Sequence, residues 1–361
     1  MKVSRLLASI AILGSASIAL TACDPPMPPE VAAAIAEQTY TCVEGNAAVS
    51  SPSLMTDIVV GWADSLSYSC VDDPTTTDVV EQATMTFSVA DATTPAEAEI
   101  SEYPALCTPV QTVPLAVEAG VLVYMESDLS SFSVSPKSFA GILNGTITNW
   151  NQLGADNPGT EMPNLPLKVA PTADTMALKS ITDYLSAQGQ KVSSSVVTAT
   201  NNPSVDLYSA LEEGEVAIVP NSYAVYLGLY PASIYLGMDK ATESPILATP
   251  DLAGIYAAST QWKIQKDANS ISLSLDPSKT AEPAPGFDSA PPPYQAIYPV
   301  NYYTCNSSGL VLSAIGRFIL RLDSQGSIGA SNYAQLPEYI RIESLLMISK
   351  GLPTPTPTPT E

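Results

Sequence analysis

Histidine is absent from this chain of 361 residues, and basic residues are scarce, with 14 Lys and Arg against 36 Asp and Glu. Without imidazole the chain lacks the usual general base, the commonest transition-metal ligand and the side chain that titrates near neutral pH. The sequence therefore excludes histidine-dependent enzymes. The formal net charge of -22 would repel a phosphodiester backbone, so we expect no nucleic-acid partner.

Other motifs of catalysis and cofactor binding are also missing. The chain has no Ser-x-x-Lys, no Gly-x-x-x-x-Gly-Lys and no Gly-x-Gly-x-x-Gly. The adjacent acids Glu212 and Glu213 are interpreted as solvated charges, because neighbouring helical positions point in different directions. We therefore expect neither an enzyme nor a bound cofactor.

The first residues have the pattern of an export signal, with Lys2 and Arg5 before an apolar stretch over residues 6–20. That stretch ends in Leu20-Thr21-Ala22-Cys23, which resembles the lipoprotein box of bacteria. The resemblance implies that residues 1–22 are removed and that Cys23 carries lipid, which would anchor the protein outside the cytoplasm to a bacterial membrane. The alternative is a plain secretory signal with Cys23 in a disulfide. Residues 23–45 form a Pro-rich N-terminal segment.

Four further cysteines remain, an even number in an exported chain: Cys42, Cys70, Cys107 and Cys305. Disulfides are the expected state, and the sequence leaves all three pairings open. A tetrathiolate metal site is disfavoured because it usually needs close Cys-x-x-Cys pairs, so no metal is expected.

Between the ends of the chain, strand patterns alternate with helix patterns. Strands are predicted over 84–89, 121–125, 167–170 and 216–219, and helices over 135–145 and 175–185. Ser135, Pro136 and Gly145 supply a cap, a first helical residue and a stop for the first of these helices. Residues 281–293 are predicted to be a Pro-rich loop, and residues 351–361 a Pro-Thr tail. This alternation predicts an α/β fold.

Several short motifs then follow in one order along the chain: Val60–Asp64, Phe87–Ala92, Asn144–Asn151, Asn157–Gly159, Leu165–Val169, Gly214–Val219 and Asn332–Pro337. In this order they resemble the phosphate-binding protein of bacterial phosphate ABC transporters, a periplasmic binding protein of type II. The resemblance covers roughly residues 46–350 and marks the chain as a degenerate copy.

The resemblance implies an α/β fold of two lobes, with mixed sheets and a hinge of crossing strands. Lobe 1 would comprise about 46–130 plus 296–350, and lobe 2 about 131–295. Such receptors are monomers that hold an anion between the lobes and deliver it to an ABC transporter permease. An acidic chain can bind an anion in this way, because helix N-termini supply positive potential without charged side chains.

The resemblance also implies a set of binding residues. Ser53 and Leu54 match the family's Thr-Phe pair at the first helix, although Ser53 is equally well explained as a helix cap. Thr76 lies in the stretch that matches a Gly-Ser-Gly turn, here without glycine. Asp91 matches the family's Asp that accepts a hydrogen bond from a protonated phosphate oxygen, and the alternative is a turn-forming Asp.

The largest departure is at Pro171, where the family has an Arg in an Arg-Ser-Asp-Gly-Ser-Gly-Thr run. The charged clamp is therefore lost, which should lower the affinity by several powers of ten. Thr172 and Thr175 still offer hydroxyl and backbone donors, and Asp174 is either part of the site or a simple cap. We thus expect a solute-binding lipoprotein for phosphate or a related small anion. The alternative is a surface lipoprotein that keeps the fold as a structural or protein-interaction module.

Overall fold

The computed structural model describes residues 48–51, 53–69, 75–76, 85–88, 109–125, 129, 131–193, 197–200, 211–305 and 309–352. All of them lie within one compact unit, Tyr40–Glu361. The predictions for residues 1–22, for Cys23, Cys42, Cys70, Cys107 and Asp91, and for the tail beyond residue 352 fall outside the described residues. Cys305 ends a strand, and the disulfide pairing stays a prediction.

The described strands are mostly short, with one long exception. They are β1 Ala48–Ser50, β2 Thr75–Thr76, β3 Met85–Ser88, β4 Pro109–Met125, β5 Ser133–Val134, β6 Lys168–Val169, β7 Thr172–Asp174, β8 Thr198–Thr200, β9 Glu215–Pro220, β10 Tyr230–Pro231, β11 Ser233–Met238, β12 Pro245–Ala248, β13 Trp262–Lys266, β14 Ile271–Leu275 and β15 Ile297–Cys305.

The described helices alternate with these strands. The α-helices are α2 Thr56–Ser69, α3 Pro136–Leu143, α4 Thr175–Ala187, α6 Asn221–Tyr226, α7 Leu252–Ser259, α8 Leu310–Ile319, α9 Leu322–Ser327 and α10 Glu338–Ile348. The 3-10 helices are η1 Ser53–Met55, η3 Trp150–Asp156 and η4 Ile328–Ser331. The mixed α/β class predicted from the sequence is confirmed.

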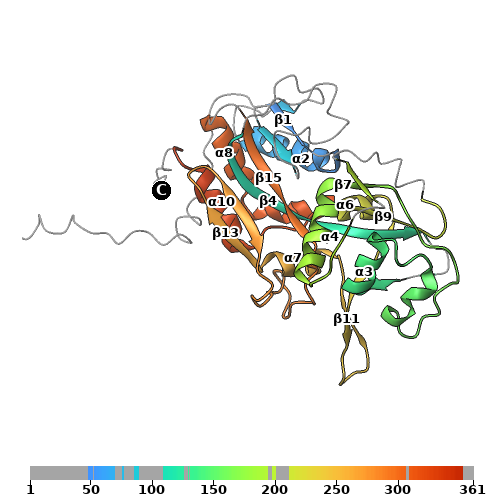
Figure 1. Ribbon diagram of the computed structural model, residues 1–361. Coiled ribbons are helices and arrows are strands. Elements are labelled where there is room, and N and C mark those ends of the chain that lie inside the picture. The colour runs from blue at the N-terminus through green and yellow to red at the C-terminus, as the bar shows by residue number, and fades with distance from the viewer. Residues whose placement is uncertain are drawn as a thin grey trace, which may run out of the picture. The chain divides into compact units, whose positions relative to one another are not determined.

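The long strand β4 joins two groups of strands in an eight-stranded mixed sheet, ordered β2-β1-β3-β15-β4-β9-β6 with β10 also on β4. Its first part, Pro109–Ala119, pairs antiparallel with β15, and its last part, Gly120–Met125, pairs antiparallel with β9. Figure 1 shows β4 and β15 as long neighbouring arrows. The predicted mixed sheets and crossing strands are therefore present.

Local signals explain why α3 forms where the sequence predicts it. The Oγ atom of Ser135 accepts a hydrogen bond from the Ser138 amide at 3.2 Å, and Pro136 occupies the first helical position. After the helix, Gly145 adopts a φ of 67°, a conformation that glycine reaches without steric cost.

The helix α4 packs directly on β4 at Gly120. A Cβ atom at this position would lie 2.3 Å from the carbonyl oxygen of Ala177 and 2.5 Å from the Oγ of Ser180. Both contacts are far shorter than van der Waals distance, so the close approach of the helix requires glycine here. From Val113 to Tyr124 every residue of β4 is buried, and the strand forms the centre of the core.

An aromatic cluster closes the core at the far end of β4. The rings of Tyr124, Phe132 and Trp150 lie with centroids 4.9 to 5.9 Å apart. The indole Nε1 of Trp150 donates to the carbonyl of Gly214 at 3.1 Å, which satisfies its one polar group. Trp150 thereby ties η3 to the turn before β9.

Among the described residues, no helix has both the length and the apolar composition needed to cross a membrane. Residues 281–293 contain no helix or strand, as the sequence predicts.

Candidate functional site

Two groups of strands end near the middle of β4. Because β3 runs antiparallel to β15, and β15 antiparallel to β4, strands β3 and β4 point the same way. The last residue of β3, Ser88, lies level with Pro114 through their shared partner Asn301. β9 points the opposite way and ends at Pro220, level with Gly120. The two groups therefore run toward each other and meet around Glu118.

The parallel neighbours of β3 and β9 reinforce this arrangement. β1 and β2 are parallel to β3, and β6 is parallel to β9, so the carboxyl ends within each group lie at one edge. In open α/β sheets, ligands bind outside the carboxyl ends of strands. The junction at the middle of β4 is thus the candidate site.

Glu118 lies at this junction with its side chain only 1% exposed. Its Oε1 accepts hydrogen bonds from the amides of Ala119 at 2.8 Å and Ser222 at 3.4 Å. The buried side-chain oxygens that form no hydrogen bond of good geometry within the described part of the chain include Oε2 of Glu118, Oδ1 of Asn221 and Oγ of Ser222, although the Ser222 hydroxyl lies close enough to the Glu118 carboxyl to lower its pKa. We call these three residues the polar cluster. Such unused hydrogen-bonding capacity is unusual in a protein interior.

Burial controls the charge of Glu118. Desolvation raises its pKa from 4.5 to about 8, the side chain and amide of Ser222 and the amide of Ala119 oppose that rise, and the charge of Asp174 adds to it. Glu118 is therefore mostly neutral at pH 7. A neutral carboxyl group donates one hydrogen bond, which a carboxylate does not.

Asp174 caps the helix α4, which begins at the next residue. Its Oδ1 accepts from the amide of Ala177 at 2.7 Å. Burial raises the pKa of Asp174 to about 6, and hydrogen bonds from the amides of Ala177 and Met176 limit the increase. The residue is mainly ionised at pH 7, so the start of α4 carries a negative charge.

The structure brings the predicted site residues to the strand ends in two sets. Thr172, Asp174 and Thr175 lie together where β7 gives way to α4, and both threonines are half-buried. Thr76 ends β2, while Ser53 and Leu54 belong to η1, which closely follows the end of β1. Their role in binding stays a prediction, and Asp91 lies outside the described residues.

The sequence reasoning missed the polar cluster. The sequence patterns single out neither Glu118 nor Ser222. A signal was available, because Glu118 is the one charged residue in the apolar run 115–124. A lone charge in a buried strand pattern is a candidate functional residue.

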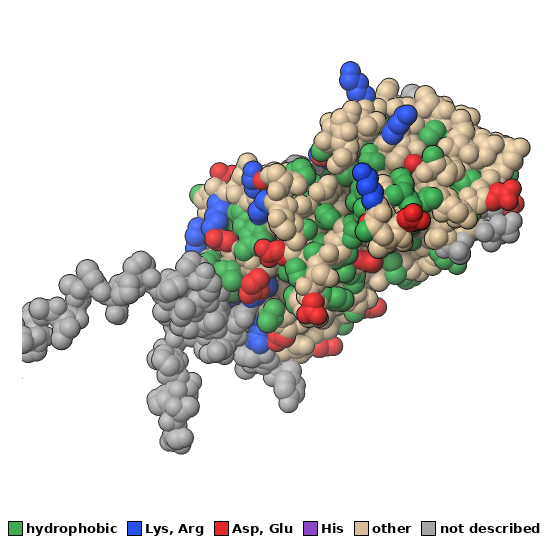
Figure 2. Space-filling view, turned by 90° about the horizontal axis from the view of Figure 1, so that it is seen from below, with side chains coloured by type: hydrophobic (Ala, Val, Ile, Leu, Met, Phe, Trp, Pro, Cys, Tyr) green, Lys and Arg blue, Asp and Glu red, His purple; other side chains and the backbone are tan. Residues whose placement is uncertain are grey.

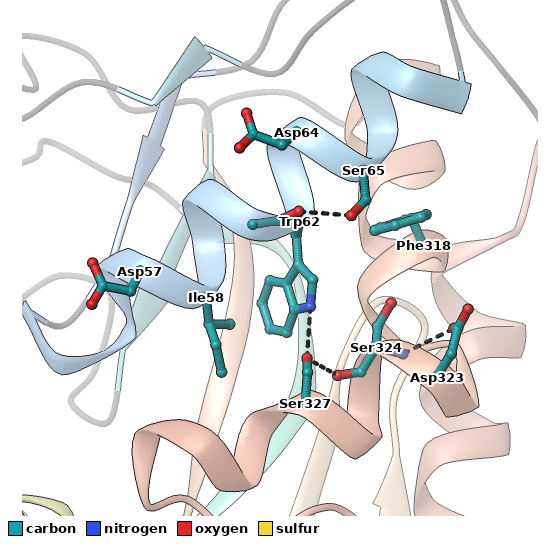
Figure 3. Close-up of a pocket in the computed structure, with 10 residues that line it drawn as sticks. Asp57, Ile58, Trp62, Asp64, Ser65, Phe318, Asp323, Ser324 and Ser327 are labelled. Atoms are coloured by element: carbon teal, nitrogen blue, oxygen red, sulfur yellow. Dashed lines mark hydrogen bonds between the residues drawn. The ribbon is translucent and has the colours of Figure 1, made fainter.

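A pocket of about 680 Å³ lies elsewhere, between α2 and the α8–α9 region (Figure 3). Ile58, Trp62 and Phe318 give it apolar walls, and Asp57, Asp64 and Asp323 line it with carboxylates. The Nε1 of Trp62 donates to the Oγ of Ser327 at 3.2 Å across this pocket. None of the predicted ligand-binding residues lines it.

The described residues contain no group of three or more His, Cys, Asp or Glu side chains that could hold a metal ion. Figure 2 shows one face of the molecule, on which acidic and basic side chains are scattered among apolar and neutral polar ones.

Comparison with solved structures identifies the fold. A DING protein is 12% identical, with 83% of this chain and 93% of that chain covered and a TM-score of 0.53. A human phosphate-binding apolipoprotein is 12% identical over the same shares, with a TM-score of 0.51. A phosphate-binding protein from Stenotrophomonas maltophilia is 13% identical over 85% and 93%, with a TM-score of 0.44.

The chain therefore has the fold of phosphate-binding proteins, as the resemblance in its sequence implies. No protein-family model matches the chain, and no curated protein matches it in sequence.

Proposed function

We propose that this chain is an extracytoplasmic solute-binding lipoprotein that captures phosphate or a related small anion at the junction in the middle of β4. The observation that carries the proposal is the polar cluster, because its buried polar side chains lie where two groups of strand ends meet. The chain acts by binding and performs no catalysis.

Backbone dipoles supply the attraction in this proposal. The helix α4 has 13 residues and begins at the junction, so its N-terminus carries partial positive charge. Thr172 and Thr175 add hydroxyl donors next to it. The first basic residue of α4, Lys179, is exposed and pairs with Asp183, so it does not serve the junction. The anion is therefore held without a charged side chain, and weakly compared with an Arg clamp.

The lipid on Cys23 would hold the receptor at the membrane, close to the ABC transporter permease to which it delivers its solute. Two or more acyl chains give stable anchoring, whereas one chain binds only reversibly. The receptor works as a monomer of two lobes, divided as the sequence predicts.

Calorimetry and thermal unfolding of the purified protein test this function, with phosphate, sulfate and nitrate added at pH 6. We expect phosphate to bind with release or uptake of heat, and to raise the unfolding temperature. A ligand at 100 times its Kd should stabilise the fold by about 2.7 kcal/mol. Absence of heat and of any thermal shift with all three anions would contradict the proposal.

Two variants on one helix sharpen the test. Asp174→Asn keeps a capping oxygen but removes the negative charge, so phosphate affinity at pH 7 should increase several-fold. Asp183→Asn removes an exposed charge on the same helix and should leave the affinity unchanged. Equal effects of the two substitutions would place the anion away from the start of α4.

One observation favours the second candidate function, an interaction module without a ligand. The β11–β12 hairpin projects from the rest of the fold in Figure 1 and exposes Leu236, Met238 and Ile246 at 47%, 41% and 37%. Exposed apolar side chains grouped in this way mark contact surfaces. Under this alternative, substituting these residues would abolish partner binding while no anion bound to the junction.

A further inference from the structure

The pocket between α2 and the α8–α9 region is a second concave site in the fold (Figure 3). Its volume of about 680 Å³ falls within the range of small-molecule sites, about 300–1,000 Å³. No residue of the polar cluster lines it, and none of the residues predicted to bind an anion lines it either. The pocket is therefore separate from the proposed anion site, and what it binds is an independent question.

Part of the pocket lining is apolar. Ile58 and Trp62 lie one turn apart on α2, and Phe318 is contributed by α8. The indole Nε1 of Trp62 already donates to the Oγ of Ser327 at 3.2 Å, which uses the one polar group of this side chain. Ile58, Trp62 and Phe318 therefore offer an occupant apolar contact and no hydrogen-bond donor.

Gly61 opens the pocket on the side of α2. It lies one turn after Ile58 and one turn before Ser65, on the helix face that lines the pocket. A glycine inside a helix lowers stability by about 1 kcal/mol relative to alanine. The fold does not require glycine here, because its φ is not positive and an added Cβ would meet no described atom within 4 Å. The missing side chain instead leaves room for an occupant to approach the helix.

The charged groups that line the pocket are all acidic. Asp57, Asp64 and Asp323 contribute exposed carboxylates, and the described lining includes no Lys or Arg. Arg321 lies nearby, 5.7 Å from the centre of the Phe318 ring, and balances Asp323 through two hydrogen bonds of 3.1 and 2.9 Å. Asp57 has no such basic partner within the described part of the chain, whose full sequence has a formal charge of -22. The pocket therefore attracts a cation and repels an anion.

We propose that this pocket binds a small organic cation, in which an ammonium group is attached to an apolar chain or ring. The apolar part packs on Ile58 and Trp62 in the space that Gly61 leaves open. The ammonium group lies in the field of Asp57 and Asp64, which are seven residues apart and therefore on one side of α2. Exposed ion pairs contribute little to affinity, so apolar contact supplies most of the binding and the carboxylates select the sign of the charge.

Fluorescence titration of the whole protein with hexylamine, hexan-1-ol and hexanoate at pH 7 tests this site, because the three probes share an apolar chain and differ in charge. Of the three tryptophans, only Trp62 lines the pocket, so a signal that disappears in Trp62→Phe reports this site. We expect hexylamine to bind roughly tenfold more tightly than hexan-1-ol, about threefold for each α2 carboxylate, and hexanoate to bind least. Added salt should reduce this preference.

Substitutions separate the contributions of charge and space. Replacing both Asp57 and Asp64 by Asn should lower the affinity for hexylamine to that for hexan-1-ol, whereas Asp183→Asn on α4 should leave the preference unchanged. Gly61→Leu should block all three probes and keep the fold, because its Cβ meets no described atom. The inference fails if no probe binds to the wild type, if all three bind equally, or if the preference for the amine survives the double substitution. Each of these outcomes leaves the proposed anion site unaffected.

Discussion

Burial within β4 raises the pKa of the Glu118 side chain well above its ordinary value. Its pKa of about 8 lies above the ordinary 4.5, so the folded protein holds a proton that the unfolded chain releases. The contribution of Glu118 to the free energy of unfolding is therefore largest at low pH, and it falls as pH rises through the window from 4.5 to about 8. Asp174 acts with the same sign, but its window ends near pH 6.

Urea denaturation across this pH range provides the measurement at the residue scale. Between about pH 6 and pH 8 the wild type should lose roughly 1.4 kcal/mol of unfolding free energy per pH unit on account of Glu118. Glu118→Gln has no proton to lose, so its slope over the same range should be smaller by that amount. Parallel curves for the two proteins would show that Glu118 does not titrate in this window.

At the scale of elements, alanine substitutions at two glycines test the contact between α4 and β4. Gly120→Ala would push a methyl group against the backbone carbonyl of Ala177, which is part of α4 and cannot rotate away. We expect a loss of about 1–3 kcal/mol of unfolding free energy, as for other overpacked cores. Chemical denaturation gives this quantity directly.

Gly61 is the matched control for the same substitution. It lies inside α2, where an added Cβ would meet nothing within 4 Å. Gly61→Ala should therefore stabilise the protein by about 1 kcal/mol through helix propensity alone. A loss of stability at both glycines, or at neither, would contradict the packing described for α4.

Elements with local signals are those that the sequence predicts well. Cap and stop residues predict α3, because these signals act within a few residues, and the helix predicted over 175–185 corresponds to α4. The strand β4 was predicted only over 121–125, yet it begins at Pro109. Prolines at 109 and 114 argue against a strand, and the structure accommodates Pro114 beside an irregularity in the pairing with β15.

The residues of the candidate site likewise fall into those that a local sequence pattern places and those that it does not. Thr172, Asp174 and Thr175 were placed by resemblance to a family, and their position at the start of α4 follows from the local pattern of strand and helix. The meeting of Glu118 with Ser222 depends on the register of β4 with β9, which joins residues about a hundred positions apart. No local pattern in the sequence encodes that register.

At the scale of the whole molecule, the proposed membrane anchor rests on Cys23 alone. Cells supplied with labelled palmitate should incorporate label into the wild type, and the protein should sediment with membranes. Cys23→Ala should incorporate none and should no longer be held by a lipid. Label in the Cys23→Ala variant would refute the anchor, whereas the anion affinity of the two proteins should be equal.

The central claim is that the strand ends in the middle of β4 hold the solute. Hydrogen exchange of the whole protein, measured with and without saturating phosphate at pH 6, tests it most directly. We expect slower exchange in three segments, residues 118–122, 174–178 and 221–225. Slower exchange confined to residues 57–65 and 318–327, which line the pocket beside Trp62, would contradict the account, as would exchange that phosphate leaves unchanged throughout the chain.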